Sequence, residues 1–176
     1  LATASFGHGI TTTLLQLAKA YSIVVNGGYQ IKPKLVKNNN NEKKEKILSQ
    51  DLSREILPIL RKIVSTKDGT ASLANVNGYE IGGKTGTAEK SADGEYSNKK
   101  INSFVSVFPT SKPKFVLAVM LDEPKINENY IYHYRDGSNI KYKGTPFNTA
   151  GWTTVEATGQ IVEKIGPILA TKYSEF

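Results

Sequence analysis

Residues 82–88 read GGKTGTA, so that almost no side-chain bulk surrounds one lysine and two threonines. Glycine inside a strand costs stability and often marks the close approach of another backbone or of a ligand. Lys84 offers a cation, while Thr85 and Thr87 offer hydroxyl donors. The segment therefore predicts a strand along which an extended peptide could pair, with a carboxylate bound by these side chains.

Two other interpretations of this segment stay open. It could be a glycine-rich turn in which Lys84 is merely solvated. It could also be a nucleotide-binding loop, since Gly78 and residues 83–85 satisfy the spacing Gly-x-x-x-x-Gly-Lys-Thr. That loop joins a strand to a helix, whereas residues 74–77 make a poor strand and residues 86–88 a poor helix start. The strand interpretation is therefore favoured.

The segments that follow predict an antiparallel sheet. Strands are predicted over the glycine-rich segment 79–88, over 101–108, which alternates partly, and over the apolar segment 115–121. The short turn at 110–113 joins the last two as a hairpin. A further short strand is predicted over 30–36, where Pro33 favours an edge position.

Helical spacing of apolar residues predicts three helices. The first begins after a threonine cap at 11–13 and ends at Gly27-Gly28. The second covers 52–65, with Ser49 or Asp51 as its cap and a late start or a kink at Pro58. The third covers 154–173 and is bent at Gly166-Pro167. Polar loops are predicted at 38–46 and 122–147. Helices that flank an antiparallel sheet predict an α+β fold.

Composition narrows the functional classes. The chain has 176 residues, no cysteine and a formal net charge of +7. Without cysteine, disulfides and cysteine-rich zinc sites are excluded, and no metal or cofactor is predicted. The lysines at 43–46, 99–100 and 112–114 lie among Asn, Ser and Pro, which indicates solvated loops rather than a nucleic-acid surface. No apolar run is long enough to span a bilayer. The chain opens on Leu-Ala-Thr-Ala-Ser, which indicates a fragment.

Lys-Thr-Gly is one of three signatures of serine penicillin-binding proteins and β-lactamases. Eight further segments surround it. In chain order, they are SFGHGI at 5–10, LLQLAKAY at 14–21, NGG at 26–28, GTA at 69–71, GY at 78–79, SFVSVFP at 103–109, VMLDEP at 119–124 and TAGW at 149–152. With these segments, the chain resembles the class B penicillin-binding proteins over nearly its whole length. The Ser-Phe-Gly loop and the Asp-Glu-Pro ending are similar to the cell-division branch.

The resemblance implies a β-lactamase/transpeptidase-like domain of which residues 1–176 are the C-terminal portion. It implies a serine D,D-transpeptidase that cross-links peptidoglycan stem peptides during septal wall synthesis. The implied partners are these stem peptides, the lipid-linked precursor and other cell-division proteins, with β-lactams as inhibitors. The implied location is the periplasmic face of the bacterial inner membrane, with the anchor upstream.

The resemblance also implies roles for individual residues. Lys84 would support proton transfer and attract the substrate carboxylate, which Thr85, Gly86 and Thr87 would bind. The backbone N–H of Thr87 would be one oxyanion donor. His8 would border the cleft, although a solvated loop histidine is an equally good interpretation.

The nucleophile itself is not predicted within this chain. No Ser-x-Asn is present, and Ser-x-x-Lys occurs only at Ser97, Ser111 and Ser138. All three follow Lys84, the wrong order for the family, and lie in polar or proline-containing segments. We therefore expect the reactive serine upstream of Leu1, and the chain alone to be inactive.

The chain departs from the family pattern at three places, and three alternatives to the implied activity stay open. Ser106 stands where the family has glycine, Glu89 where some relatives have a cation, and 127–143 resembles an insertion. The alternative activities are a D,D-carboxypeptidase or a β-lactamase of the same superfamily. A non-catalytic interaction module that keeps the fold is the alternative of a different class.

Overall fold

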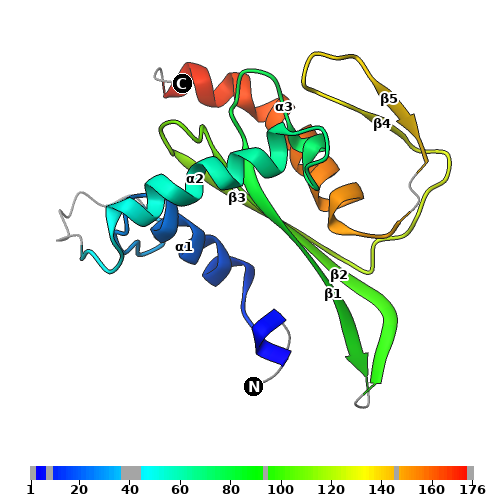
Figure 1. Cartoon of the computed structure of the whole chain (residues 1–176), viewed down its shortest axis with the longest axis horizontal. Helices are drawn as coiled ribbons and strands as arrows, with labels where there is room; N and C mark the ends of the chain where they lie inside the picture. The colour runs from blue at the N-terminus through cyan, green and yellow to red at the C-terminus, as the bar shows by residue number, and fades with distance from the viewer. Residues whose placement is uncertain (1–2, 7–9, 37–44, 93–94, 145–146, 174–176) are drawn as a thin grey trace.

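A three-stranded antiparallel sheet with helices on both faces forms the centre of the molecule (Figure 1). The computed structural model describes residues 3–6, 10–36, 45–92, 95–144 and 147–173. Helices α1 and α2 cover one face of the sheet and α3 covers the other, which confirms the predicted α+β class. The elements are η1 (Thr3–Phe6), α1 (Leu14–Val25), α2 (Gln50–Ser65), η2 (Ser72–Ala74), β1 (Gly82–Ala92), β2 (Glu95–Phe108), β3 (Phe115–Asp122), β4 (Ile131–His133), β5 (Lys141–Lys143), η3 (Ala150–Trp152) and α3 (Thr154–Lys172).

The strands follow the order β1-β2-β3, and the predicted hairpin between β2 and β3 is confirmed. β1 begins three residues later than expected and continues to Ala92, while β2 begins earlier, at Glu95. The two strands pair along this extension, and their ribbon projects beyond the helices (Figure 1). The register places Thr85 opposite Phe104 and Thr87 opposite Asn102.

Side-chain alternation along β2 divides the core between the two faces of the sheet. Phe104 and Phe108 pack in one cluster with Val162 of α3. Val107 packs on the opposite face with Leu60 of α2. Both faces of β2, the central strand of the described sheet, are therefore buried.

Local sequence signals explain the helix ends. Thr13 caps α1 in a capping box with Gln16, and the chain leaves the helix through Gly27 and Gly28, both with positive φ. Ser49 caps α2. This helix starts early and continues through Pro58, which cannot donate the usual backbone hydrogen bond. α3 likewise continues through Pro167.

Two predictions are wrong. Residues 30–36 do not form a strand, and only an isolated bridge joins Tyr29 to Lys46. The segment 122–147 is more than a loop, because β4 and β5 pair antiparallel within it. Tyr132 of β4 is buried and its ring lies 5.2 Å from that of Trp152. This packing, rather than strand length, holds the pair in place.

Candidate functional site

Lys84, Thr85, Gly86 and Thr87 lie in the middle of β1, which is one of the two edge strands of the three-stranded sheet that the structure describes. Gly83-Lys84-Thr85 is therefore not at the start of a helix, which excludes the nucleotide-binding loop. An edge strand leaves backbone N–H and C=O groups available for pairing with another extended chain. The predicted peptide-binding geometry thus has a suitable backbone.

The first two glycines of the segment are explained by packing. A Cβ on Gly82 would lie 2.6 Å from Thr110 Cγ2 and 3.0 Å from the backbone of α2. A Cβ on Gly83 would lie 2.5 Å from the Val105 carbonyl oxygen and 2.7 Å from the Phe104 ring. The approaching groups at these positions are the protein's own, and only Gly86 is free of backbone crowding.

Arg61 ties α2 to the start of this strand. Its Nη1 donates to the Ile81 carbonyl oxygen at 2.7 Å, and its Nη2 donates to Asn75 Oδ1 at 3.0 Å. Burial lowers the pKa of the Arg61 guanidinium, and the nearby charge of Glu80 opposes this. The position of β1 is therefore fixed immediately before the lysine-threonine segment.

Strand alternation separates the predicted site side chains. Lys84 is paired with Val105 and points to the face of α1 and α2, whereas Thr85 and Thr87 point to the face of α3. Lys84 is exposed and its Nζ donates to the Thr85 carbonyl oxygen at 2.9 Å. The Lys84 cation therefore lies on the α1/α2 face of the sheet, and the Thr85 and Thr87 hydroxyl groups lie on the α3 face.

Thr85 and Thr87 are contacted by two loops for which the sequence predicts no role. Thr70 Oγ1 lies 3.4 Å from Thr85 Oγ1, and the Ala150 N–H donates to Thr87 Oγ1 at 3.0 Å. The loops also meet each other, since a Cβ on Gly151 would lie 2.7 Å from the Thr70 carbonyl oxygen. The segments GTA and TAGW were the only sequence signal for these contacts, and neither indicated a partner.

The remaining sequence predictions have different outcomes. His8 lies outside the described residues. Ser97 lies within β2, Ser111 follows β2, and Ser138 lies between β4 and β5. None of these three Ser-x-x-Lys serines therefore begins a helix. Ser97 Oγ donates to the Lys90 carbonyl oxygen at 3.0 Å. Ser106, in place of the expected glycine, is buried and its hydroxyl donates to the Leu117 carbonyl oxygen at 3.1 Å.

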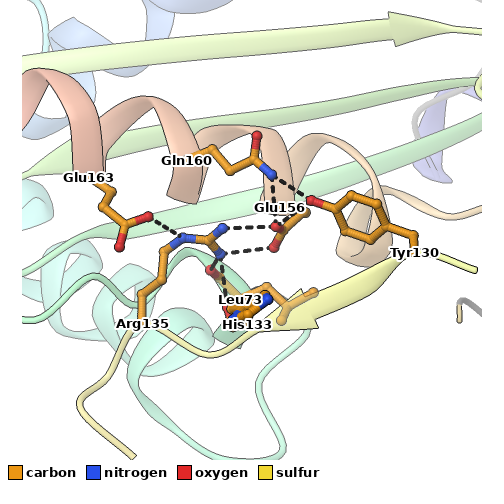
Figure 2. Close-up of polar contacts among 7 residues, drawn as sticks. All are labelled: Leu73, Tyr130, His133, Arg135, Glu156, Gln160 and Glu163. Carbon is orange, nitrogen blue, oxygen red and sulfur yellow. Dashed lines mark hydrogen bonds and ion pairs between the residues drawn. The ribbon is translucent and has the colours of Figure 1, made fainter. Parts of the chain in front are cut away.

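The segment 127–143 is anchored to α3 by a buried polar network (Figure 2). Arg135 donates to both oxygens of Glu156, and it also contacts Glu163 and the carbonyl oxygens of Leu73 and His133. Desolvation acts to lower the pKa of Arg135, but its hydrogen bonds to Glu156 outweigh this and raise the pKa. The network joins β4, η2 and α3 into one unit.

A pocket of about 410 Å³ lies between the end of α2, η2 and the β4–β5 segment. Lys67, Lys141 and Asp136 line it, together with tyrosine and hydroxyl side chains, but none of residues 82–88 does. Within the part of the chain that the structure describes, no group of His, Asp and Glu has the arrangement of a metal site. No described helix is long and apolar enough to cross a membrane.

The comparisons with known proteins agree with this geometry. Residues 1–140 match the family model described as the penicillin binding protein transpeptidase domain. The chain belongs to this family. It is 33% identical to the Caulobacter vibrioides protein named "Probable peptidoglycan D,D-transpeptidase FtsI", over 98% of this chain and 28% of that protein. It is 37% identical to Stage V sporulation protein D of Bacillus subtilis, over 70% of this chain and 21% of that protein.

Solved structures support the same fold. The transpeptidase domain of Burkholderia pseudomallei penicillin-binding protein 3 aligns with a TM-score of 0.74 and 29% identity, over 95% of this chain and 46% of that chain. The chain thus spans about a quarter of the curated relatives' length and about half of that solved domain. The fold expected from the resemblance, that of penicillin-binding transpeptidase domains, is confirmed.

Proposed function

We propose that this chain is the C-terminal portion of the catalytic domain of a D,D-transpeptidase that cross-links peptidoglycan stem peptides during septal wall synthesis. The observation that carries the proposal is the position of Lys84, Thr85, Gly86 and Thr87 on an edge strand. Family membership supports the reaction class, and the name of the Caulobacter relative, a probable peptidoglycan D,D-transpeptidase, supports a role in wall synthesis.

In the proposed reaction, β1 holds the end of the stem peptide. The edge backbone pairs with the peptide, and the Thr85 and Thr87 hydroxyl groups donate to its terminal carboxylate. Lys84 contributes positive charge that attracts the carboxylate and supports proton transfer at the nucleophile. The Thr87 N–H would stabilise the oxyanion together with the N–H of the nucleophile.

The nucleophile in this proposal is a serine outside these 176 residues. Its hydroxyl oxygen attacks the carbonyl carbon of the penultimate D-Ala, and the terminal D-Ala leaves with the proton on its amino group. An amine of a neighbouring stem peptide then attacks the acyl-enzyme, which releases the serine and forms the cross-link. β-Lactams would acylate the same serine. His8 is proposed to border this cleft, and the domain is proposed to lie at the periplasmic face of the inner membrane.

The test is acylation of the full-length protein by benzylpenicillin, measured by intact mass and located by peptide mapping. We expect one adduct on a serine upstream of residue 1, within Ser-x-x-Lys, with Ser-x-Asn between it and Lys84. The absence of an adduct would favour a non-catalytic module. Rapid release of the adduct would favour a β-lactamase, and hydrolysis of stem peptides without cross-linking would favour a D,D-carboxypeptidase.

A further inference from the structure

The hydroxyl group of Thr87 is oriented by a loop far away in the sequence. A hydroxyl group has one hydrogen and two lone pairs. One lone pair of Thr87 Oγ1 accepts the Ala150 N–H at 3.0 Å, over a separation of 63 residues. No residue that the structure describes accepts the Thr87 hydrogen, and Thr87 is exposed. The direction in which this hydrogen points therefore depends on where Ala150 lies.

Two threonines hold the turn that contains Ala150. Thr153 Oγ1 donates to the Thr149 carbonyl oxygen at 2.9 Å, and Thr154 Oγ1 donates to the Ala150 carbonyl oxygen at 3.2 Å. Both bonds close the short η3 turn onto the start of α3. Because the single hydrogen of Thr153 is used in this bond, Thr153 can only accept from any further partner.

That partner is Asn102, which lies directly opposite Thr87 in the register and is fully buried. Its Nδ2 donates to Thr153 Oγ1 at 2.8 Å and lies 3.4 Å from Asn148 Oδ1. The orientation of the Asn102 amide is fixed, since both facing atoms act as acceptors. Among the described residues, Asn102 Oδ1 has no hydrogen-bond partner. A buried amide with one unpaired oxygen is costly and requires a compensating role.

We propose that Asn102 is a positioning residue for the carboxylate-binding hydroxyl of Thr87, acting through Thr153 and the turn at 149–153. This inference rests on the proposed function and adds to it a residue that touches no substrate. Asn102 and Thr87 leave the same face of the sheet on adjacent strands, so the strand pairing fixes their separation. The bonds from Asn102 to Thr153 and from Ala150 to Thr87 then place the turn against both strands.

The experiment compares two probes on the full-length protein: benzylpenicillin, which has a free carboxylate, and its methyl ester, which does not. Thr153→Val removes the hydroxyl while keeping the shape, and Thr153→Ser restores it. Asn102→Asp replaces the donor by a carboxylate that faces two acceptors. Asn98→Asp makes the same change at an exposed position of β2 and is the matched control. The second-order acylation rate and the unfolding midpoint are measured for each variant.

We expect Thr153→Val and Asn102→Asp to slow acylation by benzylpenicillin about tenfold, as for one weakened hydrogen bond to a charged group. Acylation by the methyl ester should change less than about twofold, and Thr153→Ser and Asn98→Asp should behave as wild type. An equal loss with both probes, or no loss with benzylpenicillin, would overturn the positioning role while leaving the proposed function intact. If Asn102→Asp does not fold, the Thr153→Val and Thr153→Ser pair decides. If wild type is not acylated at all, both proposals fall.

Discussion

Arg135 and Glu156 form a two-point ion pair inside the protein, with Nη1 2.9 Å from Oε2 and Nη2 2.8 Å from Oε1. Their side chains are only 6% and 7% exposed. Arg135 also contacts Glu163, but that carboxylate is 59% exposed. The two contacts therefore differ in solvation while sharing one guanidinium group (Figure 2).

The first prediction follows from this difference. Glu156→Gln leaves the Arg135 charge buried without its main partner, and should lower the free energy of unfolding by about 3–5 kcal/mol. Glu163→Gln, the matched control, should lower it by less than about 1 kcal/mol, because exposed ion pairs contribute little. Urea unfolding of each variant measures both values. Equal losses would contradict the assignment of Arg135 and Glu156 as the structural anchor.

The second prediction concerns Tyr130, whose hydroxyl donates to Glu156 Oε1 at 3.0 Å. Burial and the negative charge of Glu156 raise the pKa of Tyr130 to about 12. The folded protein thus holds this proton more tightly than the unfolded chain. The resulting stabilisation is complete below about pH 10 and is lost as the pH rises towards 12.

NMR of protein carrying ¹³C-labelled tyrosine rings measures this ionisation. Between pH 8 and 11 the Tyr130 signal should not shift, and Tyr130→Phe identifies it by its disappearance. A Tyr130 signal that titrates near pH 10 would show that neither burial nor Glu156 raises the pKa of this phenol.

The third prediction separates the glycines of β1. Gly83→Ala forces a methyl group against the Val105 carbonyl oxygen and the buried Phe104 ring, and should cost about 1–3 kcal/mol or more. Gly86→Ala meets only the Ser103 hydroxyl, which can rotate away. Its cost in unfolding free energy should be small, and Ser103→Ala should remove it. Similar losses for both variants would contradict the packing described for Gly83.

The sequence predicts correctly those parts of the fold that local signals specify. The cap at Thr13, the β2–β3 hairpin and the strand character of the lysine-threonine segment all depend on neighbouring residues or on short turns. The β4–β5 pair was missed because its strands are only three residues long and depend on contact with Trp152. Because Trp152 is distant in sequence from β4, its contact leaves no pattern in the sequence of the strands themselves.

The candidate site shows the same division. The segment that contains Lys84 and Thr85 was recognisable from its composition, but Thr70 and Ala150 were not. Their contacts involve a hydroxyl and a backbone N–H, which any turn could supply. Only the close approach of the turns at 69–71 and 149–151 brings them to β1. The opposed faces of Lys84 and Thr85 follow from alternation and could have been predicted.

The last prediction concerns Lys84 in the full-length protein. Lys84→Ala should slow acylation by a fluorescent penicillin about ten- to a hundredfold, since a charge-assisted contact of roughly 1.5–3 kcal/mol is lost beside the reacting groups. Lys99→Ala is the matched control, because Lys99 is an exposed lysine of the neighbouring strand, 3.5 Å from Glu123. It should acylate at the wild-type rate. The unfolding midpoint of Lys84→Ala should stay close to wild type, because its side chain is exposed. An unchanged acylation rate would show that the reactive cleft does not lie along β1, whereas a loss shared with Lys99→Ala would point to general surface charge.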